Sequence, residues 1–65
     1  MQIILNGQTI DIASQTLHEM IEEKGFDPDT VIAELNFELI KQENRQQVVL
    51  NEGDTVELLS FVGGG

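Results

Sequence analysis

The sequence contains no cysteine, tryptophan or tyrosine, and it has a single proline and a single histidine. Without cysteine, neither a disulfide framework nor a thiolate zinc site can stabilise the chain. One histidine cannot supply several imidazole ligands, so we expect no bound metal or cofactor. At 65 residues, 40% of them hydrophobic, the chain lies near the lower size limit for a self-sufficient core. We therefore expect one small domain packed from Ile, Leu and Val.

Basic residues are also scarce. Three lysines and arginines stand against twelve aspartates and glutamates, which gives a formal net charge of −9. Phosphate backbones would repel such a surface, so no nucleic-acid partner is expected. An acidic body is suited to docking on basic protein surfaces, although the same charge also serves simple solubility.

Long apolar runs and targeting signals are missing as well. No stretch of the sequence approaches the length needed to cross a bilayer. Residues 1–6 lack the basic start and the long apolar segment of a signal peptide. We therefore expect a cytoplasmic protein with no membrane partner.

The first structural signal is Asn6-Gly7 between two β-rich runs. A type I′ turn needs positive φ at both central positions, and Asn-Gly favours this conformation more than most residue pairs. The pattern predicts a hairpin of strands at about residues 2–6 and 8–13. Alternation turns Ile4 to one face, and the residues on the opposite face are Ile3, Leu5, Ile10 and Ile12.

A short helix follows the hairpin. Thr16 and Glu19 form the T-x-x-E pattern of a capping box, with Thr16 as the N-cap. The apolar stripe that this helix would bury consists of Leu17, Met20 and Ile21. Gly25 is placed to end the helix, and a helix of only two to three turns needs a sheet to pack against.

The rest of the chain predicts further strands. Residues 31–36 read as a strand, residues 37–40 as a turn into a short strand, and residues 41–47 as a loop with at most a helical turn. A tight turn at 51–54 leads into a last strand at 55–62. A hairpin, a helix and then more strands indicate an α+β fold of the β-grasp (ubiquitin-like) type. We expect a mixed sheet of four to five strands with one helix on one face, and a later strand beside the first.

The last strand predicts an exposed apolar patch. Val56 and Leu58 share one face, and Leu59 and Phe61 share the other. If the first pair packs under the helix, the second emerges on the helix-free face, and contiguous exposed apolar residues often mark partner sites. The alternative is a bulge that shifts the register and partly buries these side chains. The residues of the predicted patch are Ile4, Ile32, Leu59 and Phe61.

Little in the chain suggests catalysis, so we do not expect an enzyme. The helix carboxylates of Glu19, Glu22 and Glu23 read as a solvated face. His18 is expected to be exposed, without a serine or cysteine nucleophile nearby. No phosphate-binding or dinucleotide-binding glycine motif is present, because residues 63–65 precede no helix. Lys41 and Arg45 are available to contact a partner, but we interpret them as solvated loop charges.

The sequence ends on Gly63-Gly64-Gly65 after an apolar strand. Glycine has no Cβ, so such a segment can thread where no side chain fits. We expect a β-grasp domain at 1–62 and a flexible tail at 63–65. The tail is either a frayed end or a stalk that offers its α-carboxylate to the active sites of other enzymes.

Several motifs together resemble the ThiS family. They are the start Met1-Gln2-Ile3-Ile4-Leu5-Asn6-Gly7, the short capped helix, the turn Asn51-Glu52-Gly53-Asp54, and the ending Phe61-Val62-Gly63-Gly64-Gly65. The resemblance covers essentially the whole chain. Relatives often carry a proline and a basic residue after the strand near Leu39-Ile40, and here Ile40-Lys41-Gln42 follows instead.

The resemblance implies a sulfur carrier of thiamin thiazole biosynthesis. A ThiF-type enzyme would adenylate the Gly65 carboxylate with ATP and magnesium, and Gly63 and Gly64 would enter its active site. Sulfur from the persulfide of a cysteine desulfurase would convert the adenylate to a thiocarboxylate. A ThiG-type thiazole synthase would then receive the sulfur.

Three alternatives remain open from the sequence. The small subunit of molybdopterin synthase uses the same terminal thiocarboxylate, although such relatives are typically longer. A ubiquitin-like modifier would conjugate the same terminus to lysines. A β-grasp interaction module would carry an inert tail.

Overall fold

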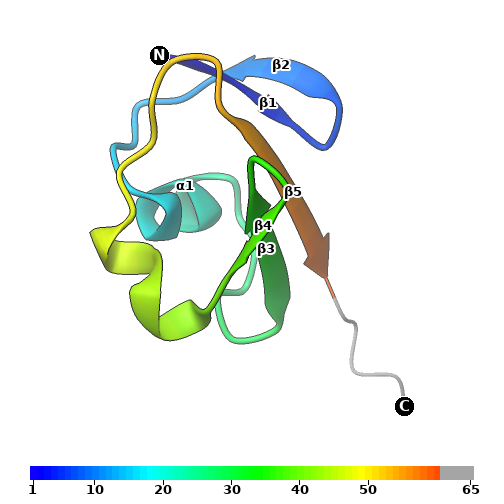
Figure 1. Ribbon diagram of the computed structural model, residues 1–65, viewed down its shortest axis with the longest axis vertical. Helices are drawn as coiled ribbons and strands as arrows, with labels where there is room; N and C mark the ends of the chain where they lie inside the picture. The colour runs from blue at the N-terminus through cyan, green and yellow to red at the C-terminus, as the bar shows by residue number, and fades with distance from the viewer. Residues whose placement is uncertain (61–65) are drawn as a thin grey trace.

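Five strands form a single mixed sheet in the order β2-β1-β5-β3-β4 (Figure 1). The computed structural model describes residues 1–60. Its elements are β1 (Gln2–Leu5), β2 (Gln8–Asp11), α1 (Leu17–Glu23), β3 (Val31–Leu35), β4 (Glu38–Ile40), the 3₁₀ helix η1 (Gln42–Gln47) and β5 (Thr55–Ser60). One α-helix with a mixed five-stranded sheet confirms the predicted α+β class.

The last strand, β5, occupies the centre of the sheet. It runs parallel to β1, with Leu5 opposite Val56, and antiparallel to β3, with Ile32 opposite Leu59. The expectation that a later strand lies beside the first is therefore confirmed. This arrangement is the β-grasp topology, with the last described strand at the centre of the sheet.

The predicted β1–β2 hairpin is confirmed. Asn6 and Gly7 both have positive φ, at 48° and 84°, as a type I′ turn requires. The Asn6 side chain has a second role, because its Nδ2 donates to the Leu58 carbonyl at 3.2 Å and its Oδ1 accepts from the Leu58 N–H at 2.8 Å. The turn therefore extends the pairing of β1 with β5 beyond the end of β1.

Both ends of α1 follow the predicted chemistry. At the N-terminus, the Thr16 Oγ1 accepts from the Glu19 N–H at 3.1 Å, and Glu19 Oε1 accepts from the Thr16 N–H at 3.0 Å. At the C-terminus, Gly25 has a φ of 83°, and the Phe26 N–H donates to the carbonyl of Ile21 at 3.1 Å. This is a Schellman ending, which satisfies carbonyls that the helix itself leaves free.

The core lies between α1 and one face of the sheet (Figure 1). The largest side chains that are fully buried are Ile3, Leu17, Met20, Ile21 and Val56. Leu58 joins them from β5, so the inward half of the predicted alternation is confirmed. Ile12 is also buried, although β2 ends one residue earlier, at Asp11, and not at residue 13.

Two expectations for polar residues are wrong. Arg45 is not a solvated loop charge, because only 4% of its surface is exposed and its guanidinium donates to the carbonyls of Pro28 and Val31 at 3.0 and 2.8 Å. His18 is not exposed either, since its side chain keeps only 23% of its accessible surface. Both changes follow from η1, which folds residues 42–47 against α1.

The remaining expectations concern the end of the chain. Phe61, the tail at 63–65 and the domain boundary at residue 62 all lie outside the described residues, and β5 is described only as far as Ser60.

Candidate functional site

The helix-free face of the sheet, called here the open face, brings together apolar residues from four strands. Ile32 and Leu59 are direct partners across β3 and β5, and Ile4 is opposite Thr55 on the same side of the sheet. Leu59 is 60% exposed, whereas Ile4 and Ile32 are half-buried. The ladder between β3 and β5 runs without interruption from Val31–Ser60 to Leu35–Val56, so no bulge shifts the register.

Leu39 belongs to the same face and was not predicted there. It pairs with Glu34 across β3 and β4, and 61% of its surface is exposed. In a strand of only three residues, the position of the preceding turn determines which side chains lie on which side of the sheet. Here the turn is Asn36-Phe37, with positive φ of 50° and 70°, and it carries Phe37 at its tip with 80% exposure. The residues of the open face used below are Ile4, Ile32, Glu34, Leu39, Glu57 and Leu59.

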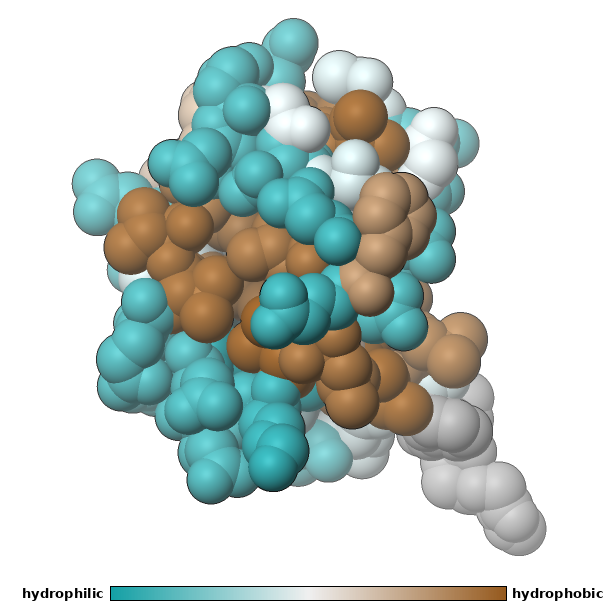
Figure 2. Space-filling model, viewed as in Figure 1, coloured by the Kyte–Doolittle hydropathy of each residue, from teal (hydrophilic) through white to brown (hydrophobic). Residues whose placement is uncertain are grey.

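A groove of about 380 Å³ crosses the open face. It is lined mainly by apolar groups, and its lining residues are Asn6, Ile32, Glu34, Glu57, Leu58 and Leu59. In Figure 2, apolar side chains next to hydrophilic groups are visible beside the end of β5. The open face is therefore a hollowed, mixed surface that includes residues near the end of β5.

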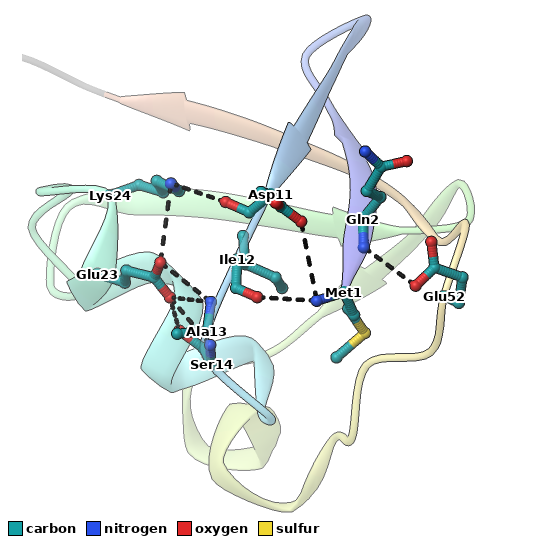
Figure 3. Close-up of polar contacts among 9 residues, drawn as sticks. All are labelled: Met1, Gln2, Asp11, Ile12, Ala13, Ser14, Glu23, Lys24 and Glu52. Carbon is teal, nitrogen blue, oxygen red and sulfur yellow. Dashed lines mark hydrogen bonds and ion pairs between the residues drawn. The ribbon is translucent and has the colours of Figure 1, made fainter.

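The carboxylates of α1 lie on an exposed face, as predicted, and two of them, Glu19 and Glu23, also hold backbone N–H groups. Glu23 accepts hydrogen bonds from the Ser14 hydroxyl and from the N–H groups of Ala13 and Ser14, which ties the segment after β2 to the helix (Figure 3). The Ser14 hydroxyl is the main cause of the lowered pKa of Glu23. The Thr16 and Gln15 N–H groups likewise lower the pKa of Glu19.

Figure 3 also shows how the start of the chain is held. The Met1 amine donates to the Ile12 carbonyl at 3.1 Å, and the Gln2 N–H donates to Glu52 Oε1 at 3.1 Å. Lys24 Nζ donates to the Asp11 carbonyl at 3.2 Å. These contacts clamp the hairpin to the helix and to the turn before β5, on the side of the domain where β1 begins.

A second hollow lies between α1 and η1. It measures about 440 Å³ and is lined by His18, Gln42, Glu43 and Gln46. His18 Nε2 lies 3.4 Å from Glu22 Oε2, and no hydroxyl nucleophile lines the hollow. Within residues 1–60, no three His, Asp or Glu side chains are grouped as metal ligands, and no helix is long and apolar enough to cross a membrane.

The mixed sheet with β5 at its centre, the single helix and the open face beside the end of β5 define a ubiquitin-like β-grasp protein. The sequence profile described as "ThiS family" matches residues 3–65. The chain therefore belongs to the ThiS family.

Comparisons with individual proteins agree with this assignment. The chain is 29% identical to the sulfur carrier protein ThiS of Escherichia coli, and the match covers 100% of both chains. The crystal structure of the thiamine biosynthesis protein ThiS from Geobacter metallireducens superimposes with a TM-score of 0.83 at 29% identity, over 100% of both chains.

A longer protein also matches. The chain is 35% identical to a thiazole synthase of Paramagnetospirillum magneticum, over 100% of this chain and 20% of that protein. The chain thus spans about a fifth of the length of the thiazole synthases that it resembles.

Proposed function

We propose that this protein carries sulfur for the formation of the thiamin thiazole ring, as a thiocarboxylate on Gly65. The observation that carries the proposal is the family match, which runs through all three glycines to residue 65. The full-length similarity to a sulfur carrier and to a thiamine biosynthesis protein supports the same pathway.

The chemistry explains why activation is needed. A carboxylate is a poor electrophile, so the Gly65 carboxylate oxygen first attacks the α-phosphorus of ATP, and pyrophosphate leaves. The sulfur of a persulfide then attacks the acyl carbon, and AMP leaves. Reduction of the resulting acyl disulfide by a thiol releases the thiocarboxylate. The glycines matter because an active site that excludes water can close around a chain without side chains.

Two partners follow from this chemistry. A ThiF-type enzyme supplies adenylation with ATP and magnesium, with sulfur passed on from a cysteine desulfurase. A ThiG-type thiazole synthase accepts the sulfur, and the match between this chain and part of a longer thiazole synthase supports that pairing. The predicted patch of Ile4, Ile32, Leu59 and Phe61 is the surface that we propose both partners use. We place this chemistry in the cytoplasm.

The proposal is tested by incubating the protein with a ThiF-type enzyme, ATP and magnesium and measuring pyrophosphate release. Activation is expected for the full chain and is expected to vanish when Gly65 is deleted. The deletion variant should keep the circular dichroism spectrum and unfolding midpoint of the full chain, which excludes misfolding as the cause. Unchanged pyrophosphate release after deletion of Gly65 would refute the carrier function.

A second measurement separates a carrier from an inert module. Intact-mass analysis of protein isolated from its native host should show a subpopulation in which one oxygen is exchanged for sulfur. A deletion strain that needs added thiamin for growth would place the protein in the thiamin pathway, and one that instead lacks molybdopterin would point to the alternative. Lysine conjugates of the chain would point to the modifier.

A further inference from the structure

Two glutamates lie directly opposite each other on the open face. Glu34 of β3 and Glu57 of β5 are cross-strand partners, and both line the groove there. Like charges at directly opposed positions destabilise a sheet. Within residues 1–60, neither carboxylate forms an ion pair with a lysine, an arginine or the terminal amine.

The chain itself offers little to neutralise this pair. Arg45 is buried and bonded to backbone carbonyls, and Lys24 lies against Glu23 and the Asp11 carbonyl. Lys41, which follows β4, is exposed and forms no ion pair with either glutamate of the pair within residues 1–60. Residues 61–65 contain no basic side chain. The net charge of −9 adds to the repulsion expected between Glu34 and Glu57 in the isolated domain.

Apolar side chains lie next to the two carboxylates on the open face. Ile32 precedes Glu34 on its face of β3 and lies opposite Leu59, which follows Glu57 on β5. Leu39 lies opposite Glu34 on β4 and is 61% exposed. A ligand that complements this surface therefore carries a positive charge for the two carboxylates, with apolar groups beside that charge.

We infer that the groove receives an arginine of the partner protein, with its guanidinium held between Glu34 and Glu57 and its neighbours packed on Ile32, Leu39 and Leu59. A guanidinium is planar and weakly hydrated, and it pairs with carboxylates through several donors, so it suits a partly apolar site better than an ammonium. The charge of the open face thereby selects a basic partner surface. This inference rests on the proposed carrier function and names the chemistry of the partner's docking surface.

The test uses the full chain and a ThiF-type activating enzyme. In the double variant Glu34→Gln/Glu57→Gln, the shape of the groove is kept and both charges are removed. We expect the KM for the carrier in pyrophosphate release to rise at least about tenfold, with kcat at saturation unchanged, because docking and not adenylation is affected. The KM of the unaltered chain should rise with NaCl, and that of the variant should respond much less.

The matched control is Glu22→Gln/Glu43→Gln, which removes the same charge from α1 and η1, away from the open face. Its KM should change less than about twofold, since rim and remote charges contribute little to affinity. Equal KM values for the two double variants would overturn the inference, because only net charge would then matter.

Thermal unfolding supplies an independent readout. Removing the repulsion should leave the unfolding midpoint of Glu34→Gln/Glu57→Gln equal to or above that of the unaltered chain. A lower midpoint would show that the pair stabilises the fold and would overturn the inference. If the unaltered chain is not activated at all, the carrier function fails, and the inference falls with it. If it is activated and the variant matches its KM, the inference alone fails.

Discussion

Arg45 is the only charged side chain that is buried within residues 1–60. It fixes η1 to the start of β3 and the segment before it through the carbonyls of Val31 and Pro28, without a carboxylate partner within residues 1–60. The Arg45 Nε atom is buried and has no hydrogen-bond partner among residues 1–60. Burial lowers the pKa of its guanidinium, although arginine stays protonated at neutral pH.

Replacing this side chain should therefore be costly. Arg45→Ala removes the donors to one buried and one partly buried carbonyl and the packing of the side-chain stem, so the free energy of unfolding should fall by about 2–4 kcal/mol. The exposed Lys41→Ala is the control, with an expected change within about 0.5 kcal/mol. Urea unfolding of both variants measures this difference, and equal losses would contradict a structural role for Arg45.

Glu23 gives the fold a dependence on acidic pH. Its pKa is lowered in the folded state by the Ser14 hydroxyl and the Ala13 N–H, so its stabilising effect is present above the glutamate pKa of the unfolded chain, about 4.3. The effect is lost as the pH falls through the lower, folded value. In Glu23→Gln, the unfolding midpoint should therefore fall less steeply with acidification than in the unaltered chain. Glu43→Gln is the control and should lose stability with acidification as steeply as the unaltered chain does. If the unfolding midpoint of Glu23→Gln also falls as steeply as that of the unaltered chain, this assignment is contradicted.

Leu59 tests the role of the open face at a single position. It is 60% exposed, so Leu59→Asp should keep the unfolding midpoint close to that of the unaltered chain. The KM for activation by a ThiF-type enzyme should rise about tenfold or more, because a charge would enter the apolar part of the interface. Val49→Asp is a matched control, since Val49 is 62% exposed and lies outside the strands of the open face. Loss of the fold in Leu59→Asp would show that the face is structural.

Among the elements, the β3–β4 hairpin has a residue with an unfavourable backbone conformation in its turn. Phe37 has a φ of 70°, a conformation that bulky residues rarely adopt, and its ring is 80% exposed. The Asn36 side chain supports the turn by accepting from the Thr55 N–H at 3.0 Å and donating to Asp54 at 3.1 Å.

Glycine at this position should relieve the strain. Phe37→Gly converts the turn to Asn-Gly, the pair already present at Asn6-Gly7, and should raise the free energy of unfolding by about 1 kcal/mol. Phe37→Ala is the control, because it removes the ring and keeps the Cβ, so it should not give this gain. Urea unfolding measures both, and a loss of stability in Phe37→Gly would show that the ring contributes packing that outweighs the strain.

Local signals predicted the elements well and failed where distant segments meet. The Asn6-Gly7 turn, the Thr16–Glu19 capping box and the Gly25 ending depend on neighbouring residues, so the sequence was sufficient. Arg45 was misread because its partners lie 14 and 17 residues earlier in the chain. The open face was predicted from alternation, but Leu39 and the pairing of Glu34 with Glu57 required the register of β3 with its two neighbours.

At the scale of the whole molecule, charge imbalance should weaken the fold at low ionic strength. Twelve acidic residues repel one another, and only three basic side chains offset them. Salt screens such repulsion over a Debye length of about 10 Å at 0.1 M. The unfolding midpoint should therefore rise as NaCl increases from a few millimolar to about 0.15 M. Sucrose at equal osmolality is the control, and a midpoint that falls with NaCl would show that attractive ion pairs dominate.

The central position of β5 also determines how the domain bears a mechanical load. β1 and β5 are parallel neighbours, so tension between the start of the chain and the end of β5 acts along the two strands and shears their hydrogen bonds together. A peeling geometry would break them one at a time. β3 holds β5 from its other side over five residue pairs, and the Asn6 amide adds two bonds to Leu58. An enzyme that grips the chain beyond β5 would therefore pull on the best-anchored strand of the sheet.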